Sequence, residues 1–74
     1  MITVDDLTNY FFLVNENPVD HTVQISVQIE YAGGKGSHVR NFAAGYFAKH
    51  SVAQEKALLL SEFLEKLNEA EDNE

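Results

Sequence analysis

The residues of this sequence that could do chemistry are three histidines, a glycine-rich turn and several carboxylates. His21, His38 and His50 lie far apart, and none stands at a metal-ligand spacing from an acid or from another histidine. A metal site would therefore require the fold to gather them, and we predict neither a metal nor a cofactor. The chain has no cysteine, which excludes disulfides, thiolate zinc sites and thiol nucleophiles.

The glycine-rich segment 33–37 resembles a phosphate-binding loop in composition but lacks its spacing. No glycine stands five residues before a Gly-Lys-Ser/Thr sequence, and a hairpin turn explains these glycines more simply. Asp5 and Asp6 are explained by a helix start, and the C-terminal acids by a solvated helix face. No pattern places a carboxylate in an apolar pocket or forms a nucleophile motif, so we predict that the protein is not an enzyme.

Charge is distributed in three blocks within a net charge of −7. Residues 1–34 carry −5, residues 35–54 carry +3 and residues 55–74 carry −5. Such an acidic chain is repelled by nucleic acid and anionic membranes and attracted to basic partners. The middle block forms a candidate basic patch for single-stranded nucleic acid, since aromatic residues follow it. Its members are Lys35, His38, Arg40 and Lys49. The alternative is that these charges solubilise one strand while Phe42 and Tyr46 belong to the core.

Leu58 is the strongest candidate for a partner contact. On a helix it would share a face with Glu62, Glu65 and Glu69, away from the apolar stripe. An apolar side chain among exposed acids can anchor a partner protein. The alternative is that a single exposed leucine has no role, which is common.

The N-terminal segment fits two structures. Thr3 followed by two aspartates is typical of a helix start, and residues 4, 7, 11 and 14 repeat at helical spacing. In the second interpretation, which we favour, this helix ends near Asn9 and Tyr10–Val14 is a strand, because the run is aromatic and β-branched. Residues 15–20 have the composition of a turn.

A strand over residues 22–31 is the clearest element, because apolar residues alternate with polar ones. It needs a partner for its backbone groups. After the turn at 33–36, residues 38–48 fit either a helix or a strand, and the need for a partner favours a hairpin. The polar face of the strand and its edge are further candidates for contacts, including pairing across a dimer.

The last element is a helix that begins at Ser51 with a capping-box pattern to Gln54. Its predicted apolar stripe comprises Ala53, Ala57, Leu60, Leu64 and Leu67, flanked by Leu59 and Phe63. Glu55 is predicted on the opposite, exposed face, and the polar tail from Asn68 is predicted to fray.

The sequence therefore predicts an α+β fold, with a small antiparallel sheet of two to three strands under a C-terminal helix. The favoured order is α-β-β-β-α, and the alternative is α-β-β-α. Residues 1–70 form one domain, and residues 71–74 form a frayed acidic tail. Since the N-terminus lacks the basic and apolar regions of a signal peptide, we expect a cytoplasmic protein.

This order resembles that of double-stranded-RNA-binding domains. Residues 17–21, Asn-Pro-Val-Asp-His, are similar to the Gly-Pro-x-His loop of that family. Residues 49–57 are similar to its Ser-Lys-Lys-x-Ala-Lys-x-x-Ala helix start, although its paired lysines are reduced here to Lys49 and His50. The resemblance implies a shared fold, and the missing lysines imply protein binding, as is typical of family members that lack them.

Together these observations favour a small acidic protein-binding module: an inhibitor, adaptor or regulator of a larger, basic protein. Small proteins of phages and mobile elements are similar in type. The first alternative is a homo-oligomeric structural component, for example a homodimer. The weaker alternative is a nucleic-acid-binding domain that uses the basic patch.

Overall fold

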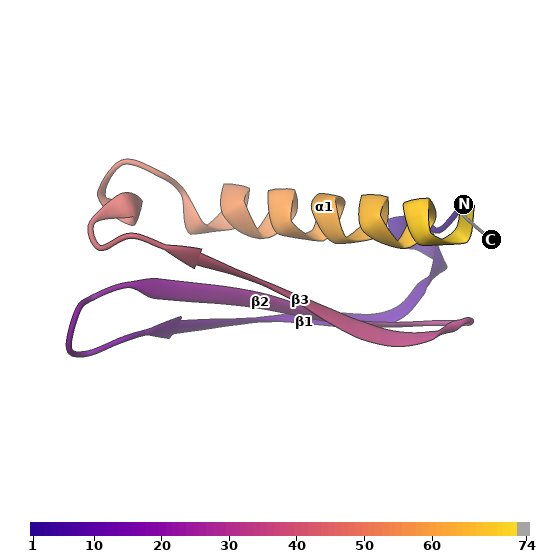
Figure 1. Ribbon diagram of the computed structural model, residues 1–74, viewed down its shortest axis with the longest axis horizontal. Helices are drawn as coiled ribbons and strands as arrows, with labels where there is room; N and C mark the ends of the chain where they lie inside the picture. Colours follow the sequence, from indigo (N-terminus) through magenta and orange to yellow (C-terminus); the bar gives the residue numbers. More distant parts are fainter. Residues whose placement is uncertain (73–74) are drawn as a thin grey trace.

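The alternating apolar residues of the central strand organise the whole structure, which is a computed structural model that describes residues 1–72. Three strands form an antiparallel sheet in the order β1-β2-β3, with one long helix across one face (Figure 1). The elements are the 3-10 turn η1 (Val4–Asp6), β1 (Leu7–Glu16), β2 (Val23–Tyr31), β3 (Gly34–Phe42), the 3-10 turn η2 (Tyr46–Ala48) and α1 (Val52–Asp72). The predicted α+β class and the sheet under a C-terminal helix are confirmed.

The hairpin β2–β3 confirms the strand interpretation for the ambiguous segment after the glycines. Tyr31 pairs with Gly34 across a two-residue turn, and the ladder continues to the pair of Val23 and Phe42. Gly34 has a φ of +144°, a conformation that residues with a Cβ rarely adopt. After Phe42 the chain leaves the sheet and forms η2, so residues 46–48 are not strand.

The core lies between α1 and one face of the sheet, with the side chains of the central strand β2 in its middle. Its buried residues are Ile25, Val27, Ile29, Phe42, Leu59, Leu60, Phe63 and Leu64. Gly36 allows this close packing, because a Cβ at this position would lie 3.0 Å from Cζ of Phe63. Burial of these side chains is the main stabilising term.

The predicted apolar stripe of the helix is correct for its leucines and Phe63 but wrong for its two alanines. Ala53 and Ala57 are exposed, whereas Glu55 is buried. The buried face is therefore rotated from the predicted one in the first turns of α1. The reason is a tertiary partner for Glu55, described below.

The predicted N-terminal helix is wrong, because η1 is a single 3-10 turn and β1 begins directly after it. The turn is closed by Asp6, whose Oδ2 accepts the backbone N–H of Thr3 at 2.8 Å. The helical spacing of residues 4–14 does not produce a helix, because the backbone groups of β1 form hydrogen bonds with β2 from Leu7 to Glu16. The favoured interpretation of Tyr10–Val14 as a strand is confirmed, and the strand starts earlier, at Leu7.

The N-terminal residues lie against the C-terminal part of α1. The side chain of Asn68 accepts the N–H of Ile2 at 2.7 Å and donates to its carbonyl at 3.0 Å. The prediction that the chain frays from Asn68 is therefore wrong, and the backbone of α1 continues to Asp72. Of the predicted acidic tail at 71–74, residues 73–74 lie outside the described residues.

The connection from β3 to α1 is held by an aromatic cluster around Tyr46. Its ring stacks on His50 with centroids 4.0 Å apart, and its hydroxyl donates to Oε1 of Glu55 at 2.8 Å. Gly45 enters the turn with a φ of +81°. Ser51 Oγ accepts the N–H of Gln54 at 3.4 Å, which is one half of the predicted capping box. The carboxylate of Glu55 raises the pKa of Tyr46, mainly because it accepts the hydrogen bond that the phenol donates, and burial adds to the shift.

Two adjacent leucines of α1 provide a matched test of this packing. Leu59 is 1 % exposed and Leu58 is 52 % exposed. Leu59→Ala should lower the free energy of unfolding by about 2–5 kcal/mol, because it leaves a cavity under the helix. Leu58→Ala changes the helix propensity by the same amount, but it should change the free energy of unfolding by less than about 0.5 kcal/mol. Urea unfolding followed by circular dichroism measures both, and equal effects would contradict the placement of the helix.

The hydrogen bond from Tyr46 to Glu55 predicts a pH dependence. The unfolded tyrosine ionises near pH ~10, whereas the folded one keeps its proton to higher pH. The stabilisation by Tyr46 is therefore complete below pH ~10 and is lost as the pH rises through the raised pKa. Tyr46→Phe should be less stable than the wild type at about pH 8, and the difference should shrink above pH ~10. Urea unfolding across this range measures it, and a constant difference would contradict the assignment.

Candidate functional site

The acidic helix face predicted around Leu58 is only partly formed. Leu58, Glu65 and Glu69 are exposed as expected. Glu62 instead turns toward β3, where its carboxylate lies 2.8 Å from Nη1 of Arg40 and 3.7 Å from Nε2 of His38. Glu62 therefore neutralises charge within the molecule, and the exposed acidic face of α1 is reduced to Glu65 and Glu69 beside Leu58.

The four residues of the predicted basic patch do not form one surface. His38 and Arg40 lie on the side of β3 that faces α1, where both approach Glu62. Lys35 lies on the opposite face of the sheet, since its neighbour Gly36 faces Phe63 of the helix. Lys49 is the C-cap residue of η2, a turn that lies beyond the other end of β3 in the chain. The fold therefore separates Lys35 from Lys49 and pairs Arg40 with a carboxylate.

The three histidines stay apart. His21 contacts Glu16 in the β1–β2 loop, His38 packs edge-on against Phe63, and His50 stacks on Tyr46. Within residues 1–72, no group of three or more His, Asp or Glu side chains is placed to hold a metal ion. Each histidine thus has a local contact.

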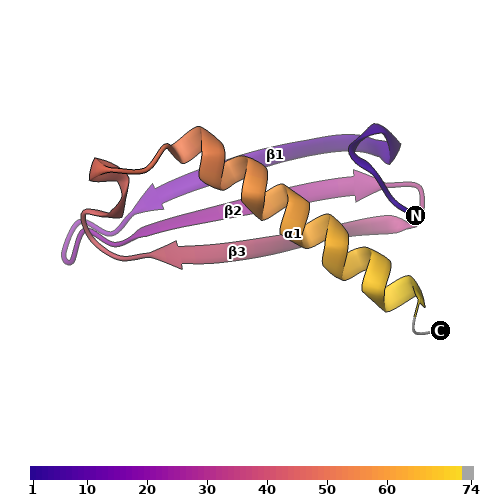
Figure 2. The same ribbon diagram turned by 90° about the horizontal axis from the view of Figure 1, so that it is seen from above.

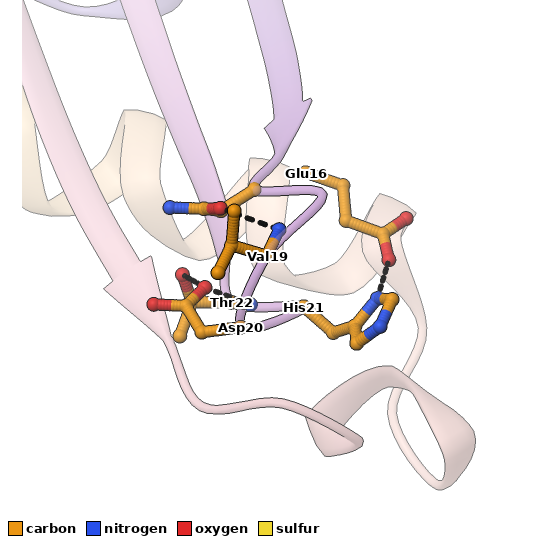
Figure 3. Close-up of polar contacts among 6 residues, drawn as sticks. Glu16, Val19, Asp20, His21 and Thr22 are labelled. Carbon is orange, nitrogen blue, oxygen red and sulfur yellow. Dashed lines mark hydrogen bonds and ion pairs between the residues drawn. The ribbon is translucent and has the colours of Figure 1, made fainter.

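The β1–β2 loop, which carries the residues similar to the RNA-binding family, is held by its own side chains (Figure 3). Asn17 Oδ1 accepts the N–H of Val19, and Asp20 accepts both the N–H and the hydroxyl of Thr22, at 3.0 and 2.7 Å. These two bonds, first the backbone N–H and then the hydroxyl, lower the pKa of Asp20. His21 has a φ of +60° and places its Nδ1 3.1 Å from Oε1 of Glu16. The loop thus presents two carboxylates.

Another candidate surface is the face of the sheet opposite α1, which no described element covers (Figure 1). Because Ile25, Val27 and Ile29 point to the helix, the residues between them point away from it. The strand register then aligns Leu13 with Ser26 and Val39, and Phe11 with Gln28 and Ser37. Phe11, Leu13 and Val39 are 44–48 % exposed. A shallow depression of about 360 Å³ lies beside Phe11, lined also by Gln28, Glu30 and Lys35.

The polar residues of this face were predicted from the alternation along β2, but its apolar residues on β1 and β3 were not. The available signal was the run Tyr10–Val14, which is apolar at every position. A strand with one solvated side should alternate, so an unbroken apolar run indicates that both of its faces are buried or used in binding.

The separated lysines and the acidic loop lead to a prediction about RNA. Titration with duplex RNA at low salt, followed by fluorescence anisotropy, should show no binding, because phosphate contacts need clustered unpaired cations. Binding that falls steeply as salt increases would contradict this and would restore the basic patch as the site.

Residues 1–72 contain no helix long and apolar enough to cross a membrane. Comparisons of the chain with protein-family models, with curated proteins and with solved structures find no match. The function must therefore be argued from the two exposed surfaces that the fold leaves: the uncovered face of the sheet and the outer face of α1.

Proposed function

We propose that the chain is a non-enzymatic protein-binding module that contacts its partner through the uncovered face of the sheet. The observation that carries this proposal is the exposure of Phe11, Leu13 and Val39 on a face that no described element covers. Large apolar side chains exposed together on one uncovered face of a small domain are typical of interaction sites.

The composition of this face favours a protein as the partner. Its centre is formed by Gln24, Ser26 and Gln28, whose amides and hydroxyl can exchange hydrogen bonds with a partner, and apolar side chains flank this centre on both outer strands. Two opposite charges, Glu30 and Lys35, stand side by side in the register near one end. Depletion of charge at the centre with charge at the rim is the pattern of protein–protein interfaces.

The net charge of −7 favours a basic protein as this partner, because opposite charge accelerates the encounter even where the contact is neutral. An inhibitor, adaptor or regulator of the type common in phages and mobile elements, acting in the cytoplasm, fits these properties. Such a role needs one specific surface and no catalytic group.

The outer face of α1 is the second candidate contact. Leu58 is exposed there with Glu65 and Glu69, and this surface would bind a basic partner directly through charge. The charges on this surface make its binding sensitive to salt, whereas binding through the sheet face would respond less.

Two matched variants separate these candidates. Val39→Lys places a charge on the uncovered sheet face, and Leu58→Lys places the same charge on the helix face at similar exposure, 48 % against 52 %. Wild type and both variants are immobilised, and the proteins retained from the extract of the source cell are quantified by mass spectrometry. Wild type and Leu58→Lys should retain a specific partner, and Val39→Lys should reduce the amount of that partner retained at least about tenfold.

The opposite pattern would contradict the sheet face and assign binding to the helix. In that case Glu65→Lys with Glu69→Lys should also abolish retention. Unfolding measurements on each variant confirm that the fold is intact, and retention unaffected by any of these variants would contradict both surfaces.

A further inference from the structure

The outer edge of β1 is a strand edge without the usual protection. β1 is at one side of the sheet, and in the described chain β2 is the strand that pairs with it. Natural proteins block such edges with lysine, proline or a bulge. Between Asp6 and Glu16 the sequence has no charged residue and no proline, and the bulge of β1 lies at its start, between Leu7 and Asn9.

β1 is also incompletely covered on both of its faces. Tyr10 and Val14 share the face of the sheet that carries α1, and Phe11 and Leu13 lie on the uncovered face, yet all four are 43–46 % exposed. Figure 2 shows the reason on the helix side: α1 crosses the sheet diagonally, from above β1 at its start to beyond β3 at its end. The first turns reach β1 through Lys56, whose Nζ lies 5.7 Å from the ring centre of Phe12.

The sequence of β1 is symmetric about Phe12. Two apolar residues stand on each side of it, and an asparagine, Asn9 or Asn15, follows at each end. If β1 pairs antiparallel with another β1 centred on Phe12, Tyr10 lies opposite Val14 and Phe11 opposite Leu13. Each asparagine then faces the other asparagine, so every residue from 9 to 15 meets one of its own chemical class.

The backbone is arranged for the same pairing. Asn17 donates its N–H to the carbonyl of Thr22, and this pair continues the register of the β1–β2 ladder. Since hydrogen-bonded and non-hydrogen-bonded pairs alternate along an antiparallel ladder, the odd-numbered residues bond β2 and the even-numbered ones point outward. The outward backbone groups therefore belong to Tyr10, Phe12 and Val14, and pairing about Phe12 places these residues opposite one another.

We infer that β1 pairs with β1 of a second copy of this chain, about a twofold axis at Phe12, to form a continuous six-stranded sheet. The axis is perpendicular to the sheet, so both helices lie on one side and the two uncovered faces join on the other. The inference does not depend on the proposed partner, because β1 pairs within the plane of the sheet while the partner binds its face.

Charge favours self-pairing at this edge over other surfaces. Two chains of charge −7 repel each other, and the stretch from Leu7 to Asn15 is neutral. In this register Glu16 lies opposite Thr8, so the two Glu16 carboxylates stay at opposite ends of the interface. Added salt should therefore strengthen the dimer by screening the net repulsion, whereas it would weaken a contact made by opposite charges.

The test is solution mass by light scattering over a concentration series, with wild type, Val14→Lys and Val39→Lys. The two valines are exposed to 43 % and 48 %, and they lie on the two outer strands. Wild type and Val39→Lys should reach the mass of a dimer, and this should occur at lower concentration when salt is raised from about 0.05 to 0.5 M. Val14→Lys should raise the dissociation constant at least about tenfold, because each dimer loses two apolar contacts and gains two edge lysines.

A second variant reports the register. Because the chain has no cysteine, Phe12→Cys introduces a single thiol at the axis, where paired Cα atoms lie within disulfide range. Oxidation should give a covalent dimer, while Val39→Cys should not. A monomer up to about 1 mM, or a dimer that Val14→Lys leaves intact, overturns the inference. A Phe12→Cys variant that dimerises without cross-linking overturns the axis at Phe12. If Val39→Lys loses the partner protein while the dimer persists, the result supports the proposed binding face and leaves the dimer inference standing.

Discussion

One helix must cover a three-stranded sheet, and the remaining structure follows from that constraint. The side chains of Ile25, Val27 and Ile29 are the most deeply buried on the sheet, because α1 packs directly over β2. Because α1 lies on one face of the sheet and crosses it diagonally, it is above β1 only near its start and has passed beyond β3 at its end. One entire face of the sheet and one edge strand are consequently left open. Both exposed surfaces are results of the packing that stabilises the domain.

The sequence predicted the elements whose periodicity reflects burial. The alternation along β2 and the leucine stripe of α1 are consequences of the core itself, so both could be recognised locally. The residues before β1 could not be assigned in this way, because the spacing of Val4, Leu7 and Phe11 satisfies a helix as well as a strand. The decision depends on pairing with β2, whose residues lie farther along the chain, from 7 residues for the pair of Glu16 and Val23 to 24 residues for the pair of Leu7 and Tyr31. A local sequence pattern does not contain this pairing.

The candidate site shows the same division. A helical wheel correctly placed Leu58 outward, since exposure of this residue depends on the helix alone. It failed for Glu55 and Glu62, because their environments are set by other elements: the hydroxyl of Tyr46 after β3, and the cations Arg40 and His38 on β3. Burial of Glu55 is tolerated because a hydrogen bond compensates it. Which acids remain free to meet a partner is thus a tertiary property.

The distribution of charge distinguishes the two open surfaces by the partner that each can accept. Acidic side chains are concentrated on α1, at the β1–β2 loop and at Asp5 and Asp6 before β1, and β1 itself is neutral from Leu7 to Asn15. Two identical acidic chains can approach each other at low electrostatic cost along that neutral edge. A basic protein, in contrast, is drawn by the whole field and can settle on the adjoining face, where Phe11, Leu13 and Val39 supply the apolar contact. A second copy would pair in the plane of the sheet, whereas a basic partner would bind along the normal to that plane. Both surfaces of one chain can therefore be occupied at once. Pairing at the edge would then join two uncovered faces into one surface twice as wide, and it would bring the Phe11 of one copy beside the Leu13 of the other at the centre of that surface.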